Sequence, residues 1–160
     1  MKTQEDKIKK SAEIAKAYID RKKYEEAHNY ILSSVDFLPI PAPSYYDLGS
    51  YFLEIGKLDL ALVNLKNALN VDGNYFEAAH DLGTSLACLG RFQEALSHYE
   101  TALKINPSND GLHFNIGLIK DRLGFHELAL ESYRHSLRLN PENYDARCNE
   151  GAILHDLGKY

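Results

Sequence analysis

The apolar positions along the chain follow a helical spacing that repeats every 34 residues. The stretches that begin at Gly56, Gly90 and Gly124 read GKLDLALVNLKNALNVDGN, GRFQEALSHYETALKINPSN and GFHELALESYRHSLRLNPEN, and Gly158 continues the series. Within each stretch the apolar residues recur three or four positions apart, which is the pattern of one face of an α-helix. The sequence therefore predicts a repeated helical unit, and this period governs the interpretation of every other feature.

Each period predicts two helices separated by the recurring glycine. The second helix ends at an Asn-Pro pair, at 106–107 and at 140–141. We expect complete units at 42–75, 76–109 and 110–143, the first helix of a truncated unit at 144–160, and a degenerate helical repeat or cap at 1–41 whose register begins at Ile8. Pro39 is either the stop of that first unit, which we favour, or part of a linker over 38–46 that leaves the unit a mobile cap.

Small residues recur at two positions of every unit. The eighth position holds Ala15, Gly49, Gly83, Gly117 and Gly151, and the twentieth holds Ala27, Ala61, Ala95 and Ala129. We expect these residues to let the two helices approach closely, with large apolar residues around the contact. One such helix pair cannot bury its apolar faces alone, so neighbouring units must stack into an array.

These offsets carry a resemblance to a known family. Leu-Gly, Ala-Leu, a tyrosine, a second Ala-Leu and Asn-Pro stand where the tetratricopeptide repeat has them, clearly over 42–160 and more weakly over 8–41, where Lys22 replaces the glycine. The resemblance implies an all-α fold, a right-handed superhelical solenoid of antiparallel helix pairs. It also implies a concave wall formed by the first helix of each unit. Lys120 and Glu150 depart from the pattern, since both occupy usually apolar positions.

Composition narrows the function. With 160 residues and 44% hydrophobic content the chain can bury a core, and its net charge of −5 provides no basic field for nucleic acid. Two cysteines without a C-x-x-C pair indicate neither a disulfide framework nor a zinc site, and we expect no cofactor or metal. The charged start and the lack of a long apolar run favour a soluble cytoplasmic protein without membrane insertion.

The resemblance also implies candidate binding residues, because peptide ligands of this family lie on the concave wall. The corresponding positions of the first helices hold Tyr46, Asp47, Ser50, Glu77, His80, Asp81, Thr84, Phe114, Asn115, Leu118, Asp121, Arg122, Cys148 and Asn149. Peptide-binding members such as O-GlcNAc transferase carry asparagine at the sixth position, where an amide both donates and accepts. Asn115 and Asn149 match, whereas Asp47 and Asp81 do not. The alternative interpretation is a set of solvated polar residues without a ligand.

The charge of this wall indicates its partner. Carboxylates outnumber cations: Glu13, Asp47, Glu54, Glu77, Asp81, Asp121, Asp145 and Asp156 against Lys9, Lys16 and Arg122. An acidic groove favours a neutral or basic segment. We therefore expect a non-catalytic module that binds an extended peptide containing lysine or arginine, with apolar side chains of the peptide on Tyr46 and Phe114.

Other functions fit the sequence less well. An adaptor for the acidic chaperone terminus needs cations that are missing, since the corresponding residues are Tyr46, Ser50, Asp81, Gly111 and Asn115 in one frame. No catalytic motif is present, and the pair His155 and Asp156 is only a weak candidate. Two alternatives stay open. The chain could be the recruiting arm of a larger enzyme such as a glycosyltransferase, or a scaffold that self-associates through its open C-terminal end, where the sequence stops before a second helix.

Overall fold

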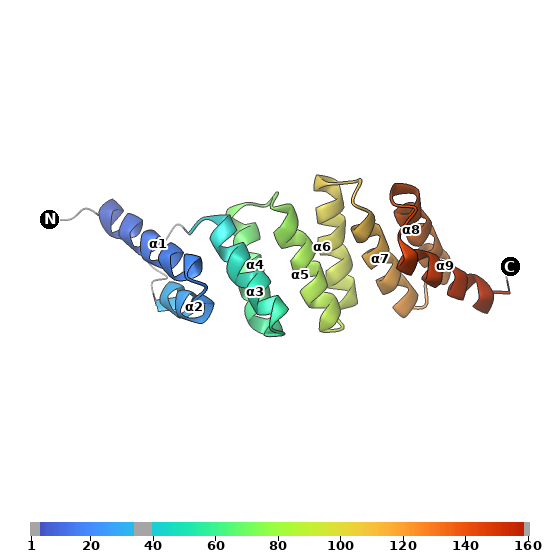
Figure 1. The fold of residues 1–160 in the computed structure, drawn as a ribbon, viewed down its shortest axis with the longest axis horizontal. Helices are drawn as coiled ribbons and strands as arrows, with labels where there is room; N and C mark the ends of the chain where they lie inside the picture. The colour runs from blue at the N-terminus through green and yellow to red at the C-terminus, as the bar shows by residue number, and fades with distance from the viewer. Residues whose placement is uncertain (1–3, 34–39, 159–160) are drawn as a thin grey trace. The chain divides into compact units, whose positions relative to one another are not determined.

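The computed structural model describes residues 4–33 and 40–158, and every regular element within them is an α-helix (Figure 1). The all-α prediction is therefore confirmed. The helices are α1 Gln4–Asp20, α2 Tyr24–Ser33, α3 Ala42–Glu54, α4 Leu58–Val71, α5 Phe76–Cys88, α6 Phe92–Ile105, α7 Asp110–Arg122, α8 His126–Leu139 and α9 Tyr144–Asp156. Pro39 and the rest of 34–39 lie outside the described residues.

The chain forms two compact units, Met1–Ser85 and Leu86–Tyr160. Antiparallel helix pairs dominate each of them: α1 with α2 and α3 with α4 in the first unit, and α7 with α8 in the second, where α9 packs on α8. We describe the two units separately, and refer to them as the first and second unit.

The recurring glycines form the turns inside the helix pairs. Gly56 has a φ of 74°, a left-handed conformation that costs a residue with a Cβ about 1–2 kcal/mol. Its amide donates to the carbonyl of Leu53 at 3.0 Å, and the Lys57 amide donates to the carbonyl of Phe52 at 2.8 Å. These two bonds define the Schellman motif, which satisfies the last carbonyls of a helix. Glycine recurs every 34 residues because this turn recurs.

The degenerate repeat at the start of the chain keeps the same turn without a glycine. Lys22 is the residue other than glycine that has a positive φ among the described residues, at 56°. Its amide donates to Ile19 at 2.8 Å and the Lys23 amide donates to Tyr18 at 2.9 Å, as in the glycine turns. The register of the repeat therefore extends through α1 and α2, although the sequence pattern is weak there.

Asparagine residues mark the ends of the later helices. α6 ends at Ile105 and α8 at Leu139, each directly before an Asn-Pro pair, as predicted. The side chain of Asn109 accepts the Leu112 amide at 2.8 Å, and that of Asn143 accepts the Ala146 amide at 3.0 Å. Both asparagines are thus N-caps, which satisfy otherwise unpaired amides in the first turn of the next helix.

The eighth-position glycines make room for one particular side chain. A Cβ at Gly49 would lie 2.6 Å from Cγ of Leu65, and a Cβ at Gly117 would lie 2.6 Å from Cε1 of Tyr133. Leu65 and Tyr133 both occupy the twenty-fourth position of their repeat, on the second helix. The expected close approach is found at these two glycines. At Gly151, by contrast, a Cβ would meet nothing within 4 Å.

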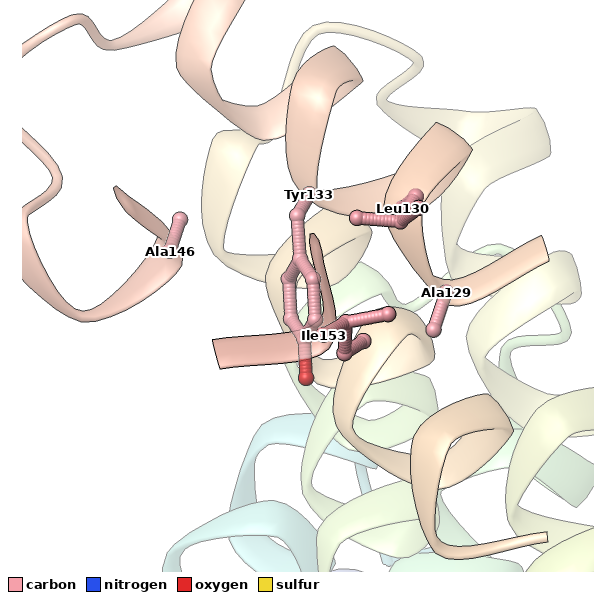
Figure 2. Packing of buried hydrophobic residues seen from close by; sticks show 5 residues of the cluster. All are labelled: Ala129, Leu130, Tyr133, Ala146 and Ile153. Atoms are coloured by element: carbon pink, nitrogen blue, oxygen red, sulfur yellow. The ribbon is translucent and has the colours of Figure 1, made fainter. Parts of the chain in front are cut away.

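The core of the second unit surrounds Tyr133. Ala129, Leu130 and Tyr133 of α8 pack with Ala146 and Ile153 of α9, and Figure 2 shows Ile153 beside the tyrosine ring. All five residues are buried, and Tyr133 is completely so. The ring therefore fills the space between α7, α8 and α9, the role that the repeat pattern assigns to a large side chain.

A buried polar contact joins the degenerate repeat to the next one. Nδ1 of His28 in α2 lies 3.3 Å from Oδ1 and 3.2 Å from Nδ2 of Asn64 in α4. Both side chains are buried, and the Asn64 amide also donates to the Leu60 carbonyl at 2.7 Å. The His28 ring packs edge-on against Phe52 of α3. Because an unpaired buried polar group is costly, this contact favours one packing of α2 on its neighbours.

The two polar departures from the repeat pattern are both paired. Nζ of Lys120 donates to Oγ of Ser132 at 3.1 Å, which links α7 to α8. Nε of Arg134 donates to Oε1 of Glu150 at 2.6 Å, which links α8 to α9. Partners on the adjacent helix thus allow polar residues at positions that are usually apolar.

Candidate peptide-binding surface

The predicted binding residues lie on the first helices of the repeats and divide between the two units. Those of the first unit lie on α3 and α5: Tyr46, Asp47, Ser50, Glu77, His80, Asp81 and Thr84. Those of the second lie on α7 and α9: Phe114, Asn115, Leu118, Asp121, Arg122, Cys148 and Asn149. Lys9, counted above among the cations of the wall, has a side chain outside the described residues.

In the first unit, three predicted residues share a pocket of about 360 Å³. Tyr46, Asp47 and Ser50 of α3 line it, together with Lys22, Tyr24, Tyr51 and Glu54. We call it the tyrosine pocket. Prediction missed Tyr24 and Tyr51, because neither occupies a wall position: Tyr24 begins the second helix of the preceding repeat. Their stacked rings, with centroids 4.3 Å apart, form one side of the pocket.

The hydroxyl of Tyr46 ties the pocket to α5. It donates to the carboxylate of Asp81 and accepts from Ser50. Burial, the charge of Asp81 and, more weakly, that of Glu77 raise the pKa of Tyr46 to about 12, so the phenol stays neutral. The structure therefore brings Tyr46, Ser50, Glu77 and Asp81 together on one face of the first unit, as the repeat register predicts.

Carboxylates near this face repel one another. Burial raises the pKa of Asp47, and the charge of Asp20 at the end of α1 raises it further. The pKa of Tyr75, whose ring centroid lies 5.3 Å from that of Tyr46, is raised by burial and then by Glu77, Asp47 and Asp72. Each of these shifts shows excess negative charge around the group.

The two remaining predicted residues of the first unit have local roles. Nδ1 of His80 lies 2.9 Å from Oδ1 of Asp81, an ion pair when the imidazole is protonated. Oγ1 of Thr84 donates to the carbonyl of His80 at 3.2 Å. His80 thus modulates the charge of Asp81, while Thr84 contributes to the helix itself.

In the second unit, the two apolar candidates are partly taken up by the core. Phe114 and Leu118 pack against the buried cluster around Tyr133, and the Phe114 ring centroid lies 5.8 Å from that of Tyr133. Both residues are half-buried. They could offer a ligand only the outer part of each side chain, which is less apolar surface than the wall positions alone suggest.

The polar candidates of the second unit gather near the Tyr133 hydroxyl. Burial and the charge of Asp121 raise the pKa of Tyr133 to about 12, while nearby Asn149 and Arg122 lower it. Asn149 lies close by, yet the hydroxyl makes no hydrogen bond of acceptable geometry with any described residue. Asp121 also accepts from Nδ1 of His126 at 2.9 Å, so histidine partly offsets its charge.

The predicted cysteine and the weak catalytic pair are both exposed. Cys148 is a free thiol beside the Tyr144 hydroxyl, and Cys88 is also a free thiol. His155 and Asp156 lie 3.4 Å apart with side chains 72% and 83% exposed, and an exposed pair of this kind has little electrostatic effect. Within the described residues, no three histidines, cysteines or carboxylates are arranged to hold a metal ion, and no helix is long and apolar enough to cross a bilayer.

Solved structures with the same arrangement of helices are tetratricopeptide repeat proteins. A structure of MamA protein covers 93% of this chain and 84% of its own at 22% identity and a TM-score of 0.83. YrrB, described as a TPR protein with an unusual peptide-binding site, covers 86% and 71% at 23% identity and a TM-score of 0.72. The first TPR of Spaghetti (RPAP3), bound to the HSP90 peptide SRMEEVD, covers 73% and 93% at 22% identity and a TM-score of 0.70.

The sequence matches the family directly. A profile described as TPR repeat matches residues 83–124, and one described as Tetratricopeptide repeat matches residues 42–75 and 111–143, which together exceed half of the chain. No curated protein sequence matches it. On the repeat profiles, the helix pairs and the glycine turns, the chain belongs to the tetratricopeptide repeat family.

Proposed function

We propose that this protein is a non-catalytic module that binds an extended peptide segment of neutral to basic character along its first helices. Two of the similar structures are described as binding peptides, which supports the general role. The preference for a basic segment comes from the acidic residues of α3 and α5. We further propose that the module works in a reducing compartment such as the cytoplasm, which fits the free thiols Cys88 and Cys148.

The observation that carries this proposal is the tyrosine pocket and the charge around it. Tyr46, Asp47 and Ser50 line one pocket, and Tyr46 is bonded to Asp81. The raised pKa of Asp47 shows that its negative charge lacks compensation. A cationic segment would supply that compensation, whereas an acidic one would add to the repulsion.

The same charges argue against an acidic peptide such as SRMEEVD. Gripping such a ligand requires cations that form charge-assisted hydrogen bonds with its carboxylates. In the first unit, α3 carries no lysine or arginine and α5 carries none, whereas Asp47, Glu54, Glu77 and Asp81 lie on them. We therefore expect this chain to differ in specificity from the RPAP3 repeat domain, although the two share a fold.

Fluorescence polarisation with three labelled probes tests the proposal. A short peptide of alternating alanine and lysine should bind, and binding should weaken as ionic strength rises. The matching alanine and glutamate peptide and SRMEEVD should not bind. Asp81→Asn should reduce binding of the lysine peptide, while Asp59→Asn, an exposed carboxylate on α4, serves as the matched control. Equal binding of the acidic and basic probes, or an unchanged affinity in Asp81→Asn, would contradict the proposal.

A further inference from the structure

The tyrosine pocket combines aromatic surface with carboxylates at the meeting point of two repeats. Tyr24 of α2 and Tyr51 of α3 stack with an interplanar angle of 23°, and Tyr46 lies one helical turn before Ser50 on the same wall. These three rings are half-buried, so part of each remains accessible. A volume of about 360 Å³ is at the lower end of the range of small-ligand pockets, roughly 300–1,000 Å³.

Charge within the pocket is unbalanced. Asp47 and Glu54 line it, with Lys22 as the cation among its lining residues. Within the part of the chain that the structure describes, neither these two carboxylates nor Lys22 takes part in an ion pair within 4 Å. Asp20 adds negative charge close to Asp47, which raises the pKa of Asp47. The pocket thus has net negative charge beside aromatic faces.

This combination suits one chemical class of ligand. A guanidinium group is planar, stacks flat on aromatic rings and forms paired hydrogen bonds with a carboxylate. The faces of the tyrosine rings attract a cation through their quadrupole, and the carboxylates orient it. A lysine ammonium group gains from the charge as well, but it cannot stack in the same way.

We infer that the tyrosine pocket is a subsite for a cationic side chain, preferentially arginine, of the segment that the module binds. The inference rests on the proposed function, which it makes specific by naming where the positive charge of the partner lies. Tyr24 and Tyr51 provide the stacking surface, and Asp47 and Glu54 provide the carboxylates. Lys22 at the rim lowers the affinity of the pocket for cations, because like charges repel.

Single amino-acid derivatives test the pocket without a partner. The probes are N-acetyl-argininamide, N-acetyl-lysinamide and N-acetyl-citrullinamide, the last being a neutral isostere of the first. Titrated against the full chain labelled with ¹⁵N, the arginine probe should shift the amide signals of the pocket residues in a saturable way. The lysine probe should bind more weakly, and citrulline should cause no saturable shift. Equal binding of citrulline, or shifts that avoid the pocket, would overturn the inference.

Variants assign the effect to the charges. Asp47→Asn should weaken binding of the arginine probe about two- to fivefold, the range for one exposed ion pair. Lys22→Gln should strengthen it by a similar factor. Asp59→Asn on α4 is the matched control and should change nothing. If Asp47→Asn binds the arginine probe as tightly as the unmodified chain does, the pocket is not the subsite.

The outcomes separate this inference from the proposed function. If the alanine and lysine peptide binds in an Asp81-dependent manner and the arginine probe does not reach the pocket, the module binds basic segments elsewhere and the inference fails alone. If the arginine probe binds in the pocket and none of the peptides binds, the inference holds for the isolated side chain, and the proposed function fails.

Discussion

Replacing Gly117 by alanine tests whether the repeat register sets the packing of the helices. The new Cβ would lie 2.6 Å from Cε1 and 2.7 Å from Cδ1 of Tyr133, whereas carbon atoms in contact stay about 3.5–4.0 Å apart. The buried ring would have to move by about 1 Å against a close-packed core. Overpacking of this kind costs about 1–3 kcal/mol, against about 1 kcal/mol gained because alanine favours a helix over glycine. We expect a net loss of up to about 2 kcal/mol.

Gly151 provides the matched control, because it occupies the same position of the next repeat. There a Cβ would meet nothing within 4 Å. Gly151→Ala should therefore show only the gain in helix propensity, up to about 1 kcal/mol. The two substitutions are chemically identical, so the difference between them, about 1–3 kcal/mol, isolates the contact with Tyr133.

Amide hydrogen exchange under native conditions is the suitable assay, because stability in repeat arrays is local. Amides of α7 and α8 report on Gly117→Ala, and those of α9 report on Gly151→Ala. Combining Gly117→Ala with Tyr133→Leu should recover part of the loss, with a coupling of about 0.5–3 kcal/mol. If Gly117→Ala proves as mild as Gly151→Ala, or if the double variant shows no coupling, the close contact does not determine the packing.

Three further predictions concern the turn, the core and the pH response. Lys22→Gly should stabilise α1 and α2 by about 1 kcal/mol, since glycine adopts the φ of 56° without strain, and denaturant melts should show the gain. Leu82→Ala should cost about 2–5 kcal/mol because Leu82 is completely buried, and the same melts measure it; a cost below about 1 kcal/mol would contradict that burial. Partial burial, His113 and Arg138 lower the pKa of His135 from 6.5, so the unfolded chain takes up this proton first. Stability should therefore fall as the pH drops below about 6.5, and less so in His135→Gln.

The turns and the packing register could be predicted from the sequence because each depends on local geometry. A left-handed residue at the end of a helix is almost always glycine, so the spacing of Gly56, Gly90 and Gly124 located the turns directly. A small residue on one helix and a large one on the next are likewise required by close helix contact, as Gly117 and Tyr133 show.

The composition of the tyrosine pocket could not be predicted in the same way. The wall positions describe the first helix of an average repeat, whereas Tyr24 enters the pocket from the second helix of the preceding one. Whether Tyr24 and Tyr51 stack depends on their side-chain rotamers, which the spacing does not determine. Phe114 shows the opposite error: its position predicts a groove residue, but its ring also packs against Tyr133.

The departures from the repeat pattern concentrate where the candidate site lies, and this has a physical consequence. Lys22, which replaces the turn glycine at a cost of about 1–2 kcal/mol, lines the tyrosine pocket, as does Tyr24 of the same degenerate repeat. A sequence that specifies one fold is expected to break local rules mainly at functional positions. If Lys22 lowers both stability and affinity for a single cation, its remaining effect is on selectivity: a fixed positive charge at the rim disfavours segments with two adjacent cations. An isolated arginine is then the ligand that the pocket accepts best.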